Sequence, residues 1–256
     1  MNDLLSELQD NIFFITFNRT YKHNAFDDRL LMALQVALNE ANENPAVRVI
    51  VLKANGRHFS AGADIAWMQR MAQFNETENL ADAMNLARVM YALYQSQKPT
   101  IAMVQGAAMG GGAGLVAACD IAIAANTARF CFSEVKLGLI PAVISPYVIK
   151  AIGERAATWL FMSAETFDAK RALELQLVQH CVPEEELSSY TLNYAQQIAQ
   201  LAPLAVQDSK SLVRQVSDQP INEALQQFTA TLIAKKRVSA EGQRGLQSFL
   251  NKGQDV

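Results

Sequence analysis

Residues 105–114 read Gln-Gly-Ala-Ala-Met-Gly-Gly-Gly-Ala-Gly, so half of this ten-residue segment is glycine. Glycine inside a helix costs about 1 kcal/mol relative to alanine, and a cluster of five therefore needs a physical reason. One reason is close approach, because a ligand or a second element can touch a backbone that lacks Cβ atoms. Another is anion binding, since free N–H groups at a helix start face a negative charge or a developing oxyanion. Tight packing of a buried helix is the simpler alternative.

Strands and helices alternate on both sides of this glycine cluster. Periodicity and turn signals predict strands over residues 12–17, 47–52, 100–105, 121–124 and 128–132. They predict helices over residues 27–42, from Asp64 onward, over 76–97, and from the glycines to near Asp120. Beyond Glu134 most of the chain has helical spacing, apart from residues 177–182. This order predicts an α/β fold, with a core domain over residues 1–195 and a helical section over 196–256.

Composition excludes several classes of protein. The chain has 256 residues, of which 50% are apolar and 18% charged, and this argues against disorder. The net charge of −3 gives no basic excess for nucleic acid. The N-terminus lacks a secretory signal, and the longest uncharged run of low polarity, residues 106–119, is too short to cross a bilayer. We therefore expect a cytoplasmic protein with neither a membrane nor a nucleic-acid partner.

The cysteines and histidines do not form a metal-binding pattern. Cys119, Cys131 and Cys181 are widely spaced and contain no Cys-x-x-Cys pair, and the three histidines are scattered. We expect reduced thiols and no metal site.

The sequence also matches the pattern of a dinucleotide-binding motif. Gly112, Gly114 and Ala117 satisfy G-x-G-x-x-A, and Glu134 follows at about the required distance. However, the preceding strand is predicted to end near Gln105, so the tight turn from strand to glycine is missing. We therefore consider a nicotinamide dehydrogenase the weaker hypothesis.

Two further segments could carry chemistry. Residues 59–65, Phe-Ser-Ala-Gly-Ala-Asp-Ile, connect a predicted strand to a helix and would expose a second backbone N–H group. Glu134 places a carboxylate between an apolar strand and a short apolar segment. Each has a simpler explanation, as a turn with a helix cap or as a solvated side chain.

Together and in this order, the segments resemble the crotonase family, the enoyl-CoA hydratase/isomerase superfamily, from about Ile12 to Lys252. The resemblance rests on a set of short motifs, namely Asn24-Ala25, residues 60–65, residues 105–112, Cys119-Asp120-Ile121, Phe132-Ser133-Glu134 and Gly138-Leu139-Ile140-Pro141. It implies a spiral of ββα units with a helical C-terminal section that forms trimers. It also implies substrates that are thioesters of coenzyme A, and no cofactor besides the CoA of the substrate.

The resemblance assigns roles by position. The amides of Ala63 and Gly111 would form an oxyanion hole, and Glu134 would be the catalytic acid and base. The residues implied for CoA binding are Ala61, Asp64, Ile65, Phe249 and Lys252, the last two reaching the CoA of a neighbouring subunit in a homotrimer or a dimer of trimers. Those implied for the acyl pocket are Trp67, Met68, Gly114 and Pro141.

One position departs from the pattern of the family. Hydratases of this family typically have two glutamates, and the first falls here on Gly114. An isomerase needs only one base, so Δ3–Δ2 enoyl-CoA isomerisation is an alternative to hydration of a 2-enoyl-CoA. Residues 141–157 resemble bacterial methylglutaconyl-CoA hydratases of leucine breakdown and favour hydration, with 3-methylglutaconyl-CoA as a candidate substrate. A third hypothesis is a non-catalytic member of the family that binds RNA or a protein.

Overall fold

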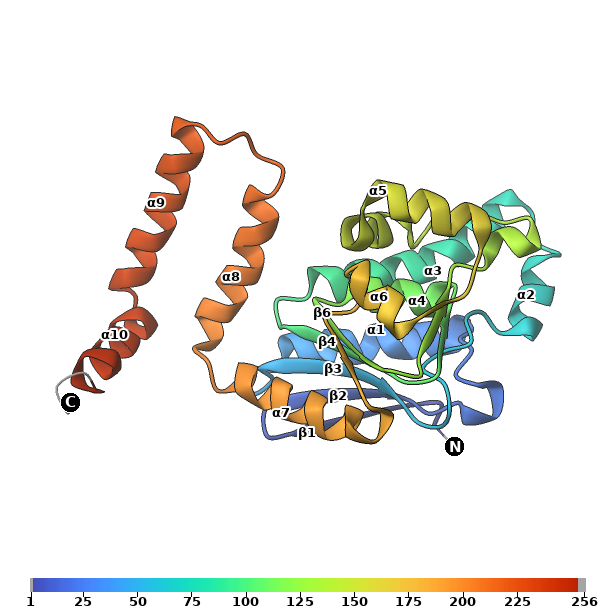
Figure 1. Cartoon of the computed structure of the whole chain (residues 1–256), viewed down its shortest axis with the longest axis horizontal. Coiled ribbons are helices and arrows are strands. Elements are labelled where there is room, and N and C mark those ends of the chain that lie inside the picture. The colour runs from blue at the N-terminus through green and yellow to red at the C-terminus, as the bar shows by residue number, and fades with distance from the viewer. Residues whose placement is uncertain (1, 253–256) are drawn as a thin grey trace. The chain divides into compact units, whose positions relative to one another are not determined.

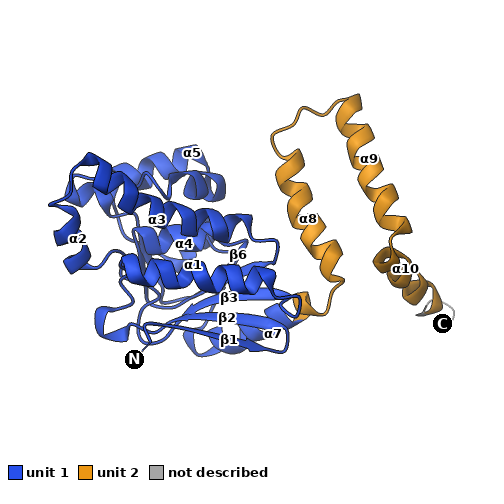
Figure 2. Cartoon of the chain, turned by 180° about the vertical axis from the view of Figure 1, so that it is seen from behind, with its two compact units in different colours: residues 1–196 blue, residues 197–256 orange. Residues whose placement is uncertain are grey.

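The structure is a computed structural model that describes residues 2–252. The chain divides into two compact units, Met1–Gln196 and Gln197–Val256 (Figure 2). No described helix is long and apolar enough to cross a membrane. Among the described residues, no three or more His, Cys, Asp or Glu side chains group together as metal ligands would.

Unit 1 is built on a six-stranded sheet with the order β1-β2-β3-β4-β6-β9. Its strands are β1 (Leu4–Gln9), β2 (Ile12–Phe17), β3 (Val49–Ala54), β4 (Thr100–Val104), β6 (Ile121–Ala125) and β9 (His180–Val182). All neighbouring pairs are parallel except β1 with β2. The strands β2 and β3 are apolar and almost entirely buried, as strands covered on both faces are.

A second sheet of three short strands contains part of the glycine segment. It has the order β5-β7-β8, formed by β5 (Ala107–Met109), β7 (Arg129–Cys131) and β8 (Phe167–Asp168). The parallel pairing of β5 with β7 brings the glycine segment next to the residues that precede Glu134.

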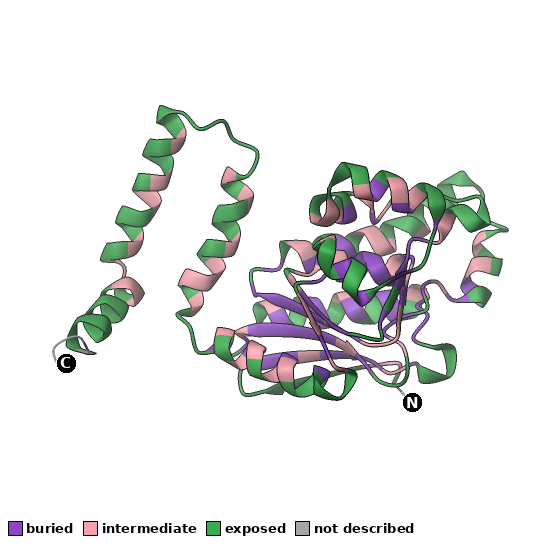
Figure 3. Ribbon diagram, viewed as in Figure 1, coloured by how far each residue is buried: buried purple, intermediate pink, exposed green. Residues whose placement is uncertain are grey.

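The helices of unit 1 are labelled in Figure 1. They are α1 (Asp28–Glu43), α2 (Ile65–Met71), α3 (Glu76–Gln95), α4 (Gly111–Ala118), α5 (Ser145–Ser163), α6 (Ala169–Glu174) and α7 (Leu187–Ala199), with the short 3-10 turns η1 (Thr20–Lys22), η2 (Glu134–Leu137) and η3 (Glu184–Glu186). Asp27, Asp64 and Asn75 cap α1, α2 and α3 with their side chains, so these helices begin where the sequence predicts. Figure 3 shows the buried residues concentrated in the strands and in the helices that pack on them.

Three strands were not predicted from the sequence, namely the two-residue strand β8 and the longer strands β1 and β5. β1 carries exposed polar side chains and pairs residue for residue with β2, from Leu4 with Phe17 to Gln9 with Ile12. β5 lies inside the glycine segment, where the composition hid a three-residue strand. In both cases the strand is stabilised by its partner rather than by its own residues.

Unit 2 contains α8 (Pro203–Val216), α9 (Glu223–Val238) and α10 (Ala240–Lys252). Neither α8 nor α9 has a buried residue within the described part of the chain. An α/β core unit and a helical C-terminal unit are the architecture that the sequence predicts.

Candidate active site

The glycine segment is joined directly to residues 59–65 in the structure. Ser60 and Ala108 form a parallel bridge, in which the Ser60 amide donates to the carbonyl of Ala107 at 2.9 Å. The Met109 amide donates back to the carbonyl of Ser60 at 3.0 Å. Two segments that are far apart in sequence are therefore held side by side by backbone hydrogen bonds.

Glycines allow this close contact. A Cβ atom on Gly112 would lie 2.9 Å from Cβ of Ser60, and one on Gly62 would lie 3.0 Å from the carbonyl oxygen of Met109. Gly62 also has a φ of +93°, which L side chains rarely adopt. Close approach of the two segments is thus the reason for glycine at these positions.

The amide of Ala63 is directed away from its neighbouring segment. In the parallel bridge between Phe26 and Ala63, the Phe26 amide donates to the carbonyl of Gly62, and the Asp64 amide donates to the carbonyl of Phe26, both at 2.9 Å. The bonds of a parallel bridge are made by the residues on either side of Ala63, so its own N–H group points outward. Within residues 2–252 this N–H group has no protein acceptor.

The amide of Gly111 is available for a different reason. Gly111 is the first residue of α4, and the first N–H groups of a helix have no partner within it. The preceding amide, that of Gly110, is occupied, because it donates to the carbonyl of Cys131 at 2.8 Å, and the first hydrogen bond within α4 runs from the Gly114 amide to the carbonyl of Gly110 at 3.1 Å. No acceptor for the Gly111 amide exists in the described part of the chain. A ligand oxygen is thus a possible partner for each of the two amides.

Glu134 lies beside the start of the same helix. It begins η2, and its Oε1 atom is 3.2 Å from the position of a Cβ atom on Gly110. Its Oε2 atom is buried and has no hydrogen-bond partner among the residues that the structure describes. Burial raises the pKa of the Glu134 carboxyl, against the opposing effect of a hydrogen bond from its own backbone amide. A buried carboxyl with an unpaired oxygen and a raised pKa is typical of a catalytic acid or base.

The position of the missing carboxylate is filled by hydrocarbon. Gly114 lies one helical turn after Gly110, on the same face of α4. The space that a side chain there would occupy is taken by Ile144, with the end of Met90 next to it. Neither residue was predicted at this site, because nothing in the sequence brings them to this helix.

Three of the residues predicted to bind CoA lie in one segment of unit 1, and the structure shows how exposed each of them is. Ala61 and Ile65 are exposed, Ile65 to 72%, beside the free amide of Ala63. Asp64 is only 2% exposed, and its carboxylate is used by the cap of α2 and by an ion pair with Arg19. The Asp64 side chain therefore stabilises the fold, and its carboxylate is not exposed to a ligand at the surface.

The two predicted CoA contacts near the C-terminus belong to unit 2. Phe249 is 76% exposed there, and the side chain of Lys252 lies outside the described residues. Their role at the CoA of a neighbouring subunit stays a prediction.

The predicted acyl-pocket residues are mostly covered. Trp67 is buried and donates its indole N–H to Asp82 at 3.0 Å, Met68 is half-buried, and Pro141 is buried. Phe26, which was not predicted as a site residue, packs its ring against that of Trp67, with the ring centroids 6.2 Å apart. The end of the same ring lies next to Gly111.

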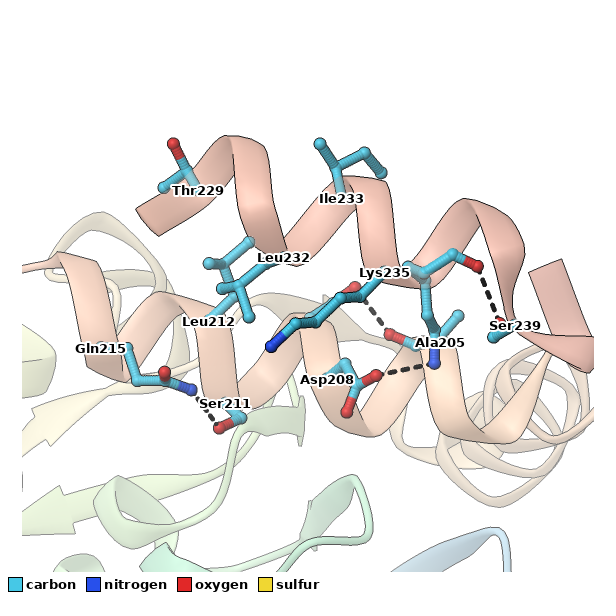
Figure 4. Close-up of a pocket in the computed structure, with 12 residues that line it drawn as sticks. Ala205, Asp208, Ser211, Leu212, Gln215, Thr229, Leu232, Ile233, Lys235 and Ser239 are labelled. Atoms are coloured by element: carbon cyan, nitrogen blue, oxygen red, sulfur yellow. Dashed lines mark hydrogen bonds and ion pairs between the residues drawn. The ribbon is translucent and has the colours of Figure 1, made fainter. Parts of the chain in front are cut away.

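A groove of about 580 Å³ lies between α8 and α9 (Figure 4). Its lining comes entirely from unit 2, and of its charged residues Asp208, Lys235 and Lys236, the first and the last are paired with each other at 2.6 Å. It contains none of the residues described above.

The family of this chain follows from its sequence and its fold together. The family described as Enoyl-CoA hydratase/isomerase matches residues 7–256, and the chain belongs to it. This confirms the resemblance and the fold class, and it places the chain in a family of enzymes.

Several relatives are similar over their whole length. A 2,3-dehydroadipyl-CoA hydratase of Escherichia coli is 32% identical over 98% of this chain and 97% of its own. The crystal structure of a crotonase-family protein from Legionella pneumophila is 64% identical, with a TM-score of 0.96 over 98% of this chain and 96% of that one. That of an enoyl-CoA hydratase from Shewanella pealeana is 42% identical, with a TM-score of 0.94 over 98% and 94%.

Proposed function

We propose that this enzyme catalyses the reversible hydration of a 2-enoyl-CoA thioester. The amides of Ala63 and Gly111 would bind the thioester oxygen, and Glu134 would act as the acid and base. The observation that carries the proposal is the buried, unpaired Oε2 atom of Glu134, at the start of the helix that presents the free amide of Gly111.

The chemistry needs each of these groups. Glu134 takes a proton from water as the water oxygen bonds to C3, and the electrons of the double bond move to the thioester oxygen as an enolate. Two fixed donors stabilise that oxygen, each worth roughly 3 kcal/mol by comparison with other oxyanion holes. Glu134 then returns its proton to C2, so water is added without a metal or a cofactor besides the CoA of the substrate.

The variant Glu134→Gln tests this assignment. It keeps the shape of the side chain but can no longer take a proton, so kcat should fall by at least about a hundredfold. The measurement is the loss of the 2-enoyl absorbance on addition of water. Glu154→Gln, the same change at an exposed position on α5, is the control and should turn over like the unchanged enzyme. Turnover by Glu134→Gln at the rate of that control would refute the assignment.

A second candidate is isomerisation of a 3-enoyl-CoA to a 2-enoyl-CoA. The observation in its favour is that Ile144 and Met90 fill the space of a second carboxylate at Gly114. One base suffices to move a proton along the substrate, and hydrocarbon beside it does not hinder that step. Offering 2-enoyl and 3-enoyl thioesters side by side separates the two, because hydration removes the conjugated absorbance and isomerisation creates it.

For the acyl group we propose 3-methylglutaconyl, on the likeness of residues 141–157 to hydratases of leucine breakdown. A panel of enoyl thioesters with straight, branched and dicarboxylic chains tests this choice. The proposal requires the highest kcat/KM for 3-methylglutaconyl-CoA, and a preference for a straight chain would overturn it.

We also propose that unit 2 assembles the chain into a homotrimer or a dimer of trimers. In support, α8 and α9 have no buried residue of their own. Apolar side chains on them, such as Leu204, Val213 and Ile233, are each at least half exposed. Light scattering after gel filtration measures the mass, and a monomer at micromolar concentration would contradict the proposal.

A further inference from the structure

Arg19 is an almost fully buried arginine that contacts three carboxylates from three separate segments. It is 8% exposed, and its guanidinium lies 3.3 Å from Asp3, 3.1 Å from Asp27 and 3.3 Å from Asp64. The same group donates a hydrogen bond to the carbonyl of Ala25 at 2.9 Å. A planar guanidinium has five donors in a fixed arrangement and can serve several acceptors at once, as this one does.

Two of these carboxylates are helix caps. Asp27 accepts from the Leu30 amide at the start of α1, and Asp64 accepts from the Ala66 and Trp67 amides at the start of α2. Arg19 therefore links the N-terminus of α1 to the N-terminus of α2 through their two capping carboxylates.

The contacts of Arg19 surround the bridge that orients the Ala63 amide. Phe26 lies between Ala25 and Asp27, both of which Arg19 contacts. Ala63 directly precedes Asp64, which Arg19 also contacts. Arg19 thus contacts both of the segments that the two hydrogen bonds of the Phe26–Ala63 bridge join.

Arg19 is also the principal counter-charge of a carboxylate that cannot reach water. Asp64 is 2% exposed, and burial alone would push the pKa of its carboxyl upward. The Trp67 and Ala66 amides and the charges of Arg19 and Lys22 outweigh this effect and hold the pKa below its ordinary value. Lys22 is farther away, at 3.6 Å, and its side chain is 45% exposed, so it replaces Arg19 poorly.

We infer that Arg19 is a positioning residue for the oxyanion hole, which sets the direction of the Ala63 amide through the capping carboxylate of Asp64. This inference rests on the proposed function, because it takes Ala63 as a donor to the thioester oxygen. Without Arg19, the Asp64 carboxylate lacks its buried counter-charge and turns toward solvent, the cap of α2 is lost, and the Ala63 amide rotates away.

Arg19→Met is the first test, measured well below its unfolding temperature. Complete loss of an oxyanion donor lowers kcat by about 10²–10³, so a displaced donor should lower it by about tenfold or more, with KM changed much less. Arg70→Met is the matched control. Arg70 pairs with Asp28 at 2.8 Å and also connects α2 to α1, but on the surface and without touching either cap. Its kcat should equal that of the unchanged enzyme.

Vibrational spectroscopy can distinguish a displaced Ala63 amide from a general loss of stability. A non-reacting acyl-CoA labelled with ¹³C at its carbonyl reports hydrogen bonding to the thioester oxygen as a lowered C=O frequency. We expect a smaller lowering in Arg19→Met than in the unchanged protein or in Arg70→Met. This reading needs no turnover, so it tests Arg19 even if hydration proves to be the wrong reaction.

The double variant Arg19→Met/Asp64→Asn supplies the rescue. Asparagine caps a helix about as well as aspartate but leaves no buried charge, so both kcat and the carbonyl shift should recover from the values of Arg19→Met. Arg19→Lys should fall in between, because an ammonium group cannot span both caps, and it replaces Arg19→Met if that variant does not fold. The inference is overturned if Arg19→Met matches Arg70→Met in kcat and carbonyl frequency, or if the double variant does not improve on it.

Discussion

A Cβ atom on Gly114 would stand 2.2 Å from Cγ2 of Ile144, so these two residues share a space that holds only one side chain. Both belong to the buried interior, and Cε of Met90 would lie 3.1 Å from the same point. The absence of a carboxylate at Gly114 is therefore matched by the presence of hydrocarbon from α3 and from the residue before α5. The carboxylate of Glu134, which belongs to η2, lies instead beside Gly110, four residues before Gly114.

Gly114→Ala should destabilise the protein although alanine favours helices. The added methyl group overlaps Ile144, and overpacking of this kind costs about 1–3 kcal/mol. Ile144→Ala alone should cost about 2–5 kcal/mol, because it leaves a cavity. Urea unfolding measures both free energies.

The double variant Gly114→Ala/Ile144→Ala should lose less stability than the sum of the two, by about 0.5–3 kcal/mol, because each change relieves the other. Strictly additive losses would mean that the two residues do not share one space.

The fall of kcat/KM at acid pH should reflect protonation of Glu134. Burial raises the pKa of this carboxyl, so on acidification it takes up its proton at a higher pH than an ordinary glutamate, and kcat/KM should fall there. The acid limb of the profile is the measurement. A limb in the range of an ordinary exposed glutamate would show that this carboxyl is not the base.

The same raised pKa predicts an effect on stability. The folded state disfavours the ionised carboxyl, so Glu134 costs stability above its folded pKa, and this cost disappears as the pH falls below the unfolded value. Glu134→Gln should therefore unfold at higher urea than the unchanged protein at neutral pH. An equal or lower urea midpoint would contradict the expected cost of the buried charge.

Gly111→Ala should impair catalysis through Phe26. The new Cβ atom would lie 2.5 Å from Cζ of Phe26, whose backbone forms the bridge to Ala63, so the two donors would be pushed apart. A displacement near 1 Å at a reacting group can cost about a hundredfold in rate, and we expect a loss of kcat of that order.

Phe26→Leu, which removes the clashing Cζ atom, should restore part of the rate of Gly111→Ala. Gly245→Ala is the matched control, since nothing lies within 4 Å of a Cβ atom there, and its kcat should not change. A Gly111→Ala variant with the kcat of that control would argue against this arrangement.

His58 should make the stability of the protein fall in mild acid. Its Nδ1 atom accepts a hydrogen bond from the Ala107 amide at 3.1 Å, and only the neutral ring can accept it there. Burial, together with the charge of Arg57 and with His23, lowers the pKa of His58 from 6.5. A histidine with a lowered folded pKa contributes stability above its unfolded value and loses it as the pH falls through the folded one.

The urea midpoint between pH 7.5 and pH 5 measures this loss. His58→Asn keeps an acceptor that does not titrate, so its midpoint should depend less on pH over this range. An unchanged dependence would assign the effect to other groups.

Local signals in the sequence predicted much of the fold. The caps Asp27 and Asp64 lie before apolar residues at helical spacing, and such signals act within one turn of the chain. The buried strands β2 and β3 are short, mostly apolar runs, which can be recognised without knowing their partners. β1, with its exposed polar residues, was missed because only its pairing with β2 makes it a strand.

The candidate site was predicted less completely than the fold. Glu134, Ala63 and Gly111 were named from short motifs, and the structure brings their segments together. Asp64 was expected at the CoA, but its carboxylate is turned inward by Arg19. Arg19, Phe26 and Ile144 carry no local signal, because each acts on residues far away in sequence.

The sequence by itself determined which segments form helices and strands, which backbone positions have no Cβ atom, and where the single acidic residue of the motif stands. These properties depend on side-chain chemistry and on neighbours within a few residues. Only the tertiary structure decided that Ser60 pairs with Ala108, that Arg19 reaches two helix caps, and that Ile144 fills the space beside Gly114. Such contacts arise when segments distant in sequence compete for the same buried volume, and that competition is settled by the packing of the whole unit.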